Sequence, residues 1–447
     1  MKRLRRGSII CLLAVLFFTN VAFAVEYQII DLGTLGGTIS QPWAINESGQ
    51  VVGRAYTLGN AAYHAFLYSG GVMNDLGTFG GTNSFAFDIN DSGLVVGWAD
   101  TPGNAANHAF LYSGGVMNDL GTLGGTDSNA HGINSSGQVV GNADTIGNAA
   151  NHAFLYSGGV MNDLGTFGGT RSVAKDINGS GQAVGTAYTT GNAAYHAFLY
   201  SGGVMNDLGT FGGTSSDARG MNDSGQVVGF AYTTGNAANH AFLYSGGVMN
   251  DLGTLGGTNS IAYEINESGQ VVGSAGTTGD AGHAFLYYGG VMTDLNDLLP
   301  SGAGWELTLA KDINNNGQIV GYGIIGGETR AFLMTPVVVD SDSDGVPDDE
   351  DNCRNVANSN QRDTNSDEDD NTSKAGIQHY GNICDPDFNN NGLVGLEDFN
   401  TWRTYYRQTV PPAPADVDLN GNGLIDLGDH NIWRQYYRRA PGPGVGD

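Results

Sequence analysis

The chain has 447 residues and a formal net charge of −27 at neutral pH. Such acidity argues against nucleic-acid binding, which needs a basic surface to displace counterions, and it suits divalent cations. The length exceeds that of one ordinary domain. Residues 25–339 carry 24 acidic and 6 basic side chains, a net charge of −18, whereas residues 340–447 carry 21 and 8, a net charge of −13. The sequence therefore predicts a long first region and a shorter, more densely acidic second region.

The first 24 residues have the pattern of an export signal. Basic residues between Lys2 and Arg6 precede the apolar run Ile9–Phe18, and Ala22-Phe23-Ala24 forms a small-residue cleavage site. The run is shorter than the roughly 20 residues that span a bilayer. No later run is long enough to cross a membrane either. We expect a secreted protein, extracellular or at a cell surface, with no transmembrane segment after signal cleavage.

The segment HAFLYSGGVMNDLG, first found at residues 64–77, recurs through the long region. Its opening histidine is found at His64, His108, His152, His196, His240 and His283, and Arg330 takes its place in a diverged last copy. The step is 44 residues four times, then 43, then 47. Each copy holds four short apolar runs bounded by glycine turns, such as SFAFDIN, LVVGWAD, HAFLYS and VMNDLG, which is typical of strands. Four strands in about 44 residues match one β-propeller blade.

The two ends of the repeat array complement each other. Residues 27–33, YQIIDLG, match only the last strand of a copy, and residues 330–336, RAFLMTP, match only the third strand. Pairing these ends would complete a last blade and leave no open edge. The sequence therefore predicts an all-β fold, a seven-bladed β-propeller of four-stranded 44-residue repeats. A parallel β-solenoid is the alternative, in which the ends need not complement each other.

The repeated elements His-Ala-Phe, Asp-Leu-Gly and Ile-Asn-x-x-Gly-x-Val-Val-Gly resemble those of the bacterial extracellular HAF repeat family. The resemblance covers nearly all of residues 27–336. It implies export and a β-rich repeat fold, and it implies no established catalytic residues. Six equivalent histidines spread over six copies indicate a packing or hydrogen-bonding position, because a catalytic site needs different roles that converge at one place.

The copies differ mainly in their first strand. One variable column reads Trp43, Phe87, His131, Lys175, Arg219, Tyr263 and Lys311. Two more columns, beginning with Gln41 and Ile39, lie two and four residues earlier, which places all three on one face of a strand. Drift at exposed sites is one interpretation. The other is that this strand is innermost and that Trp43, Phe87, His131, Lys175, Arg219 and Tyr263 form a ligand-binding ring for an extracellular glycan or a surface protein.

The acidic region opens with a calcium-loop pattern. The carboxylates at positions one, three, five, nine and twelve of the loop are Asp340, Asp342, Asp344, Asp348 and Asp351, and glycine is at position six. A disordered acidic linker is the alternative. The segments DSDGVPDDEDNC, NSNQRD and NICDPD resemble the thrombospondin type 3 repeat, which implies bound calcium. Cys353 and Cys384 are the two cysteines left after signal cleavage, and in an exported chain we expect them to form a disulfide.

Two further calcium loops follow, 31 residues apart. The ligands expected in the first are Asp387, Asn389, Asn391, the Leu393 carbonyl and Asp398. The ligands expected in the second are Asp418, Asn420, Asn422, the Leu424 carbonyl, Asp426 and Asp429. Each loop precedes a matching helix, FNTWRTYYR or HNIWRQYYR. This tandem resembles a type I dockerin, which implies a cohesin-like partner, although Leu396-Glu397 and Leu427-Gly428 stand where that family has a Ser/Thr pair.

The expected segments are a signal peptide (1–24), a HAF-repeat propeller (25–336), a calcium segment (337–386), a dockerin-like module (387–440) and a tail (441–447). We interpret the chain as a secreted, non-enzymatic binding or adhesion protein with Ca²⁺ as cofactor. The competing hypothesis is a component of polysaccharide degradation, which needs two carboxylates about 5 to 10 Å apart. Its nearest candidates are Asp88, Asp127, Asp176 and Asp217, scattered over different copies. A purely structural adhesin is a third possibility.

Overall fold

The structure is a computed structural model that describes residues 27–337, 396–409, 419 and 424–436. The chain divides into two compact units. One is Glu26–Val337, and the other combines Met1–Val25 with Val338–Asp447. The expected signal peptide, the first calcium loop and the expected disulfide lie outside the described residues.

The first complete copy of the repeat shows how each copy folds. Its four antiparallel strands are paired in chain order, and they are β2 (Gly36–Ile45), β3 (Val51–Thr57), β4 (Tyr63–Ser69) and β5 (Val72–Asp75). The same order recurs in β6 (Ser84–Ile89), β7 (Val95–Asp100), β8 (Asn107–Ser113), β9 (Val116–Asp119), β10 (Gly124–Ile133), β11 (Val139–Thr145), β12 (Asn151–Ser157), β13 (Val160–Gly165), β14 (Gly168–Ile177), β15 (Ala183–Thr189), β16 (Tyr195–Ser201) and β17 (Val204–Asp207). It continues in β18 (Gly212–Met221), β19 (Val227–Thr233), β20 (Asn239–Ser245), β21 (Val248–Asp251), β22 (Gly256–Ile265), β23 (Val271–Thr277), β24 (Gly282–Tyr288) and β25 (Val291–Asp294).

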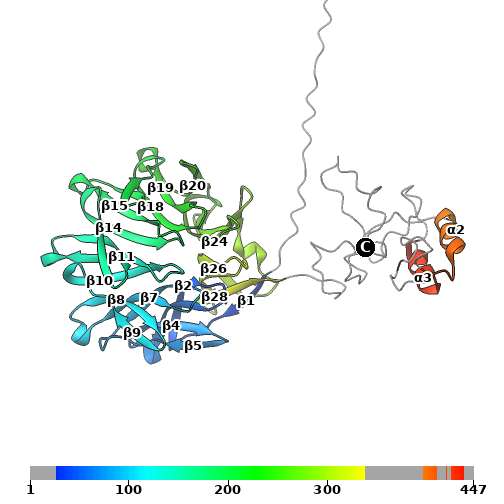
Figure 1. Ribbon diagram of the computed structural model, residues 1–447, viewed down its shortest axis with the longest axis horizontal. Helices are drawn as coiled ribbons and strands as arrows, with labels where there is room; N and C mark the ends of the chain where they lie inside the picture. Colours follow the sequence, from blue (N-terminus) through cyan, green and yellow to red (C-terminus); the bar gives the residue numbers. More distant parts are fainter. Residues whose placement is uncertain (1–26, 338–395, 410–418, 420–423, 437–447) are drawn as a thin grey trace, which may run out of the picture. The chain divides into compact units, whose positions relative to one another are not determined.

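These strands form an all-β propeller (Figure 1). Five of its sheets have four strands, and one has eight, because β12 and β14 are joined by a single parallel pair, Asn151 with Arg171. The first strand of each copy contacts the first strand of the next, and β26 contacts β2, so the first strands form a closed ring. The solenoid alternative is wrong, because the strands within each copy are antiparallel and the array closes on itself.

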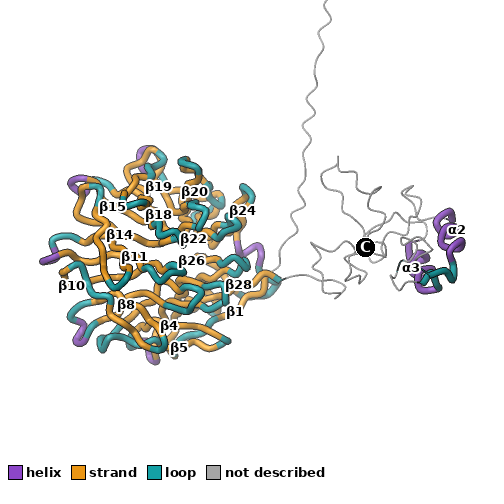
Figure 2. Tube along the Cα trace, viewed as in Figure 1, coloured by secondary structure: helices purple, strands orange, loops and turns teal. Residues whose placement is uncertain are grey.

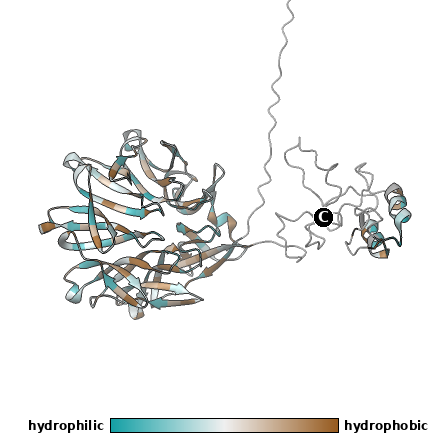
Figure 3. Ribbon diagram, in the orientation of Figure 1, coloured by the Kyte–Doolittle hydropathy of each residue, from teal (hydrophilic) through white to brown (hydrophobic). Residues whose placement is uncertain are grey.

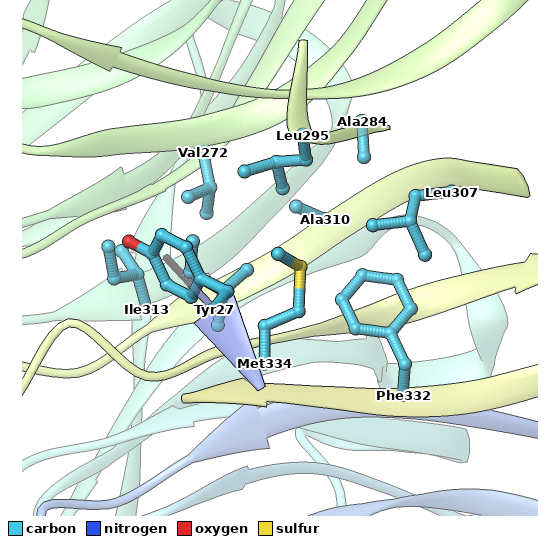
Figure 4. Close-up of a cluster of buried hydrophobic side chains, with 10 residues drawn as sticks. Tyr27, Val272, Ala284, Leu295, Leu307, Ala310, Ile313, Phe332 and Met334 are labelled. Carbon is cyan, nitrogen blue, oxygen red and sulfur yellow. The ribbon is translucent and has the colours of Figure 1, made fainter. Parts of the chain in front are cut away.

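The two ends of the array meet as the sequence predicted. The last sheet is made of β26 (Trp305–Ile313), β27 (Ile319–Ile325), β28 (Glu328–Pro336) and β1 (Tyr27–Asp31). β1 pairs antiparallel with β28 over its whole length (Figure 1). Tyr27 is buried beside Ile313 and Met334 (Figure 4), so the first strand supplies core as well as backbone hydrogen bonds.

A ring of asparagines ties the copies together. The Nδ2 group of Asn46 donates to the carbonyl of Asn90, and the bond recurs from copy to copy until Asn314 donates to the carbonyl of Asn46 at 3.1 Å. The intermediate bonds start from Asn90, Asn134, Asn178, Asn222 and Asn266. The same asparagine also accepts from its own hairpin, as Asn46 Oδ1 does from the Gln50 amide. The repeated Ile-Asn motif is thus a structural element of the closed ring.

The hydrophobic core lies between neighbouring sheets. One cluster combines Val52 and Ala65 of one copy with Ala86, Val95 and Phe110 of the next. Figure 3 shows apolar and polar segments on the strands, and the second strands begin with consecutive buried valines such as Val51 and Val52. The small serine of the first strand is also buried in every copy but the last: the Ser84 hydroxyl donates to the carbonyl of Gly77 and accepts from the amide of Ala65 in the preceding copy.

Short 3-10 turns join the second and third strands (Figure 2, purple). They are η1 (Leu58–Asn60), η2 (Pro102–Asn104), η3 (Ile146–Asn148), η4 (Thr190–Asn192) and η5 (Thr234–Asn236), and η6 (Leu295–Leu298) follows β25. Asn104 has φ 55°, a left-handed conformation that asparagine tolerates better than most residues. Its Oδ1 accepts from the Thr82 amide at 2.8 Å, which explains the repeated Gly-Asn pair of these turns.

In the second unit the structure describes two helices, α2 (Leu396–Tyr405) and α3 (Leu427–Tyr436). Trp402 and Trp433 are buried, and Phe399 lies between them with ring centres 5.6 and 5.0 Å away. These aromatics therefore form a core between the two helices. Thr409 and Leu424 also form an antiparallel bridge.

Candidate ligand-binding site

The variable column of the first strand lines one cavity. In each copy its residue occupies a β-bulge, such as the register shift between Ala130 and Gly132, which gives the strand an extra residue. The cavity has a volume of about 180 Å³. Its lining includes the whole column: Trp43, Phe87, His131, Lys175, Arg219, Tyr263 and Lys311. The first strand is therefore the innermost one, and the structure brings all six predicted ligand-binding residues together.

The bulge requires glycine in the neighbouring strand. A Cβ atom on Gly141 would lie 1.9 Å from the carbonyl oxygen of Asn129, a distance that no side chain can tolerate. Gly97 and Gly229 have the same contact in their own copies. The Val-Val-Gly triplet of the repeat thus permits the close approach that pushes the column into the channel.

The ring divides into an aromatic and a cationic part. Trp43 and Phe87 meet edge to face at 5.2 Å, and Phe87 lies 4.6 Å from His131 between ring centres. On the other side, Lys311 Nζ lies 3.5 Å from the centre of the Trp43 ring and 3.9 Å from that of Tyr263. The Cζ atom of Arg219 lies 4.6 Å from the Tyr263 ring. A cation at these distances is attracted electrostatically to the face of an aromatic ring.

Two cations of the ring, Lys175 and Arg219, lie beside the carboxylate of Asp217. Lys175 Nζ bonds to Asp217 Oδ1, which also accepts from Thr186 Oγ1 at 2.8 Å. Arg219 Nη2 is 3.6 Å from Asp217 Oδ2. Burial alone would raise the pKa of Asp217, but Lys175 and Arg219 outweigh it and lower the pKa below its ordinary value. Asp217 is therefore ionised and neutralises Lys175.

His131 is a titratable member of the ring that carries no charge at neutral pH. Burial lowers its pKa to about 4, so the imidazole is neutral at pH 7. Its Nε2 lies 2.8 Å from Oδ1 of Asn142, whose Nδ2 donates to Asn151 Oδ1. This arrangement assigns the imidazole proton to Nε2.

Carboxyl groups occupy the next position of the first strand, and they also line the cavity. The column reads Ala44, Asp88, Gly132, Asp176, Gly220, Glu264 and Asp312. Asp88 Oδ2 accepts from the Ile133 amide of the next copy at 2.7 Å. Asp176 and Asp312 make the same bond to the following copy. The small residues leave room for these crossings, and a Cβ on Gly220 would lie 2.3 Å from Glu264 Oε1.

These carboxyl groups titrate at unusually high pH. Burial, above all, raises the pKa of Asp176 to about 6 and that of Asp312 to about 7. Burial raises the pKa of Asp88 and Glu264 well above the ordinary value, and the Asp176 charge adds to the effect. Of the four enzymatic candidates, Asp88 and Asp176 thus share the cavity, whereas Asp217 bonds to Lys175 and Asp127 accepts from the Asn107 amide.

A second cavity, of about 540 Å³, shares His131 and Lys175 with the first. The other lining residues are Asn129, Asn142, Arg171, Ser172, Val173, Thr186, Tyr188, Tyr195 and Asp217. Asn142, Thr186, Tyr188 and Tyr195 were not predicted from the sequence, and they lie on second and third strands. A signal for them existed, because the residue after Val-Gly also varies between copies and reads Arg54, Trp98, Asn142, Thr186, Phe230, Ser274 and Tyr322.

The repeated histidines have the structural role that their number indicated. His64 Nδ1 bonds to Asp75 Oδ2 of the same copy at 2.7 Å. The pair recurs in the other histidine-bearing copies. In the closing sheet Arg330 replaces the histidine, and its Nη1 lies 3.8 Å from Asp31 Oδ2 on the N-terminal strand.

The expected calcium ligands fall largely outside the described residues. Of the ligands expected in the two later loops, the structure describes Leu424 and Asp426, and Asp426 Oδ1 accepts from the Gly428 amide at 2.6 Å. Among the residues that the structure describes, no three His, Cys, Asp or Glu side chains are grouped to hold a metal ion. Nor does any helix in the described ranges have the length and apolarity needed to cross a membrane.

No family model and no curated protein matches the chain. Among solved structures, the β-propeller domain of the Trilobed protease from Pyrococcus furiosus is similar over 67% of this chain and 95% of that one, with 9% identity and a TM-score of 0.46. TolB from Acinetobacter baumannii is similar over 47% of this chain and 52% of its own length, with 16% identity and a TM-score of 0.36. Trypanosoma rangeli sialidase is similar over 70% of this chain and 60% of its own length, with 12% identity and a TM-score of 0.35. The propeller architecture itself rests on the strand pairing and the closed ring described above.

Proposed function

We propose that this chain is a secreted binding protein whose propeller presents the channel cavity and the face around it to an extracellular glycan or a surface protein. One observation carries the proposal. The outer hairpins are nearly identical in the six histidine-bearing copies, whereas the most varied column of the first strand lines one cavity with a residue from every copy. Random drift at exposed positions would not by itself place the most different side chains in the channel while the exposed hairpins stay nearly unchanged.

We also propose seven blades. The eight-stranded sheet counts as two blades, because its halves share one residue pair while each half has the strand order of a separate four-stranded sheet. With the closing sheet this assigns one blade to each copy. A channel in a propeller of this kind is lined by one residue per blade from each column, which fits the column of seven in the cavity.

The acidic second region is proposed to bind calcium and to attach the protein to a surface or to a cohesin-like partner. The support is the oxygen-ligand spacing of the three loops and the position of α2 and α3, each of which begins near the end of its loop. Side-chain oxygens at alternate positions are the ligands that Ca²⁺ prefers. The disulfide between Cys353 and Cys384 belongs to the same proposal.

Hydrolysis of a polysaccharide is the second candidate function. The observation that favours it is the set of buried carboxyl groups in the cavity, because a raised pKa is what a general acid needs. Binding is favoured over hydrolysis, since Asp88, Asp176 and Asp312 each have both carboxyl oxygens bonded to backbone amides.

An array of glycans and surface proteins, probed with the full-length chain, tests the binding function. The array is run with the wild type, with Trp43→Ala and with Tyr112→Ala, which changes an aromatic residue of an outer hairpin away from both cavities. We expect specific binding that Trp43→Ala weakens and Tyr112→Ala leaves intact. Retention by both variants would place the ligand elsewhere, and release of sugar fragments that Asp88→Asn abolishes would favour hydrolysis instead.

A further inference from the structure

We propose that the channel cavity binds the carboxylate of a single acidic sugar at the end of a glycan, with Lys311 and Arg219 as the donors. This inference rests on the binding function proposed above and specifies the chemistry of its ligand. It follows from two donors that lack acceptors, from the charge around them and from the lining of the adjoining cavity.

Lys311 is the first donor. The residue is 6% exposed, and within residues 27–337 its Nζ makes no hydrogen bond or ion pair. Its neighbours are the ring faces of Trp43 and Tyr263. An ammonium group held away from water without an acceptor is costly, and an anion in the cavity would supply the missing acceptor. Burial and the nearby Arg219 lower the pKa of Lys311 well below its ordinary value, and a bound anion would oppose both effects.

Arg219 is the second donor, on the other side of Tyr263. Its Nη2 lies 3.6 Å from Asp217 Oδ2, but its Nε is buried and has no acceptor among the described residues. Its guanidinium lies over the Tyr263 ring at 4.6 Å, and the ring of Tyr263 also contacts Lys311. Two donors around one tyrosine suit a carboxylate, which has two oxygens and can accept from both.

The other charged groups of the cavity have partners of their own. Lys175 bonds to Asp217. Asp88, Asp176 and Asp312 accept backbone amides on both oxygens, Glu264 accepts the Ile265 amide on Oε1, and none of the four bonds to Lys311. The cationic side of the ring therefore lacks an acceptor for Lys311. The space beside its ammonium group is lined by Trp43 and Tyr263.

The size and lining of the cavities favour a sugar. About 180 Å³ is small for a binding pocket and suits one terminal residue. The adjoining cavity offers the amides of Asn129 and Asn142, the hydroxyl of Thr186 and the rings of Tyr188 and Tyr195. Amides and hydroxyls bond to sugar hydroxyls, and aromatic rings stack on sugar faces. The net charge of −18 over residues 25–339 would repel a polyanion, which favours a ligand with a single acidic group.

The test is a ligand-observed NMR titration of the full-length chain with glucuronate, glucuronate methyl ester, glucose, glucose 6-sulfate and hexaglutamate. The ester keeps the ring and removes the charge. We expect glucuronate to bind roughly tenfold or more tightly than its ester, because a hydrogen bond to a charged group is worth at least that factor. Lys311→Met and Arg219→Gln should each reduce the preference to about the level of the ester.

Arg54→Gln is the matched control. It removes one positive charge beside the same face, but Arg54 bonds to Gln41 and does not line either cavity. It should leave the preference for glucuronate within about twofold, because Arg54 acts on Lys311 through its charge and lines neither cavity, so it has no hydrogen bond to a bound ligand to lose. Circular dichroism checks that each variant is folded, and the two single variants are independent, so one that fails to fold leaves the other to decide.

Equal binding of glucuronate and its ester would overturn the inference, as would a preference that survives in Lys311→Met. Tighter binding of hexaglutamate or of glucose 6-sulfate than of glucuronate would replace the acidic sugar by a peptide or a sulfated ligand. Binding of neutral glycans that depends on Trp43 but not on Lys311 would overturn this inference and leave the binding function standing.

Discussion

Lys311 Nζ lies 3.5 Å from the centre of the Trp43 ring, although one residue belongs to the last copy of the repeat and the other to the first. The contact exists because the array closes on itself, with Asp312 Oδ2 of the last copy accepting from the Ile45 amide of the first at 2.7 Å. Closure therefore completes the candidate binding site as well as the fold.

The closing hydrogen bond of the asparagine ring should be important for stability. In Asn314→Ala the amide of Gln318 loses its acceptor and the carbonyl of Asn46 keeps only the Gly49 amide, which should lower the free energy of unfolding by about 1–3 kcal/mol. Urea unfolding of the propeller measures the change. Asn250→Ala removes an exposed amide that bonds only within its own sheet, and it should cost less than about 0.5 kcal/mol. Equal costs for the two variants would contradict a stabilising role for the ring.

The N-terminal strand should hold the propeller closed. Tyr27 is 4% exposed and packs against Ile313 and Met334, so Tyr27→Ala should cost about 3–5 kcal/mol. Thermal unfolding followed by circular dichroism measures the loss. Gln28→Ala, on the exposed face of the same strand, should leave the melting temperature nearly unchanged. A stable Tyr27→Ala protein would show that closure does not depend on β1.

The buried carboxyl groups should make the propeller more stable in acid. The pKa of Asp312 is about 7 in the folded protein and near 3.8 when the group is unfolded and solvated. Folding therefore favours the protonated form. The associated stability is present below about pH 4 and is lost as the pH rises towards 7, by up to about 4 kcal/mol.

Melting temperatures measured from pH 4.5 to pH 8 test this effect. They should fall with rising pH, and Asp312→Asn should flatten the fall without abolishing it, because Asp176 still titrates near 6. Asp91→Asn, at an exposed position of a turn, should keep the slope of the wild type. A wild-type melting temperature that rises steadily over this range would contradict the account.

Calcium removal should unfold the helical unit and spare the propeller. Chelation should reduce the ellipticity at 222 nm and abolish the calcium-dependent melting transition, because unpaired loop carboxylates repel one another. Asp418→Ala should weaken calcium binding measured by calorimetry, whereas Asp447→Ala, an acidic residue beyond the loops, should not. Identical spectra with and without chelator would contradict the calcium proposal.

Much of the fold could be predicted, because a repeat displays each strand several times. Periodicity predicted three features: the strands of the copy from Ser84 to Asp119, the closure by Tyr27–Asp31, and the shared channel position of Trp43 and Lys311. The bonds between copies could not be predicted in the same way. Asp88 accepts from the amide of Ile133, which follows Gly132 in the next copy. An alignment of the copies places Asp88 and Gly132 in one column, but it does not show that the side chain of one copy bonds to the backbone of the next.

The second cavity was missed for a related reason. Asn142 and Thr186 lie on second strands, where the variable position is a single residue between Val-Gly and Ala. Their pairing opposite Asn129 and Val173 becomes visible only when the register of the first two strands is known. Two variable columns that face each other across a hairpin are a better indication of a site than either column alone.

The central claim is that ligand occupies the channel cavity, and Trp43 reports on it directly. The chain has five tryptophans, so labelling with 5-fluorotryptophan yields five ¹⁹F resonances, and Trp43→Phe assigns one of them. Adding a glycan or protein that binds on the array should shift the Trp43 resonance and leave those of Trp402 and Trp433 in place. A saturating ligand that leaves the Trp43 resonance unmoved would contradict the account.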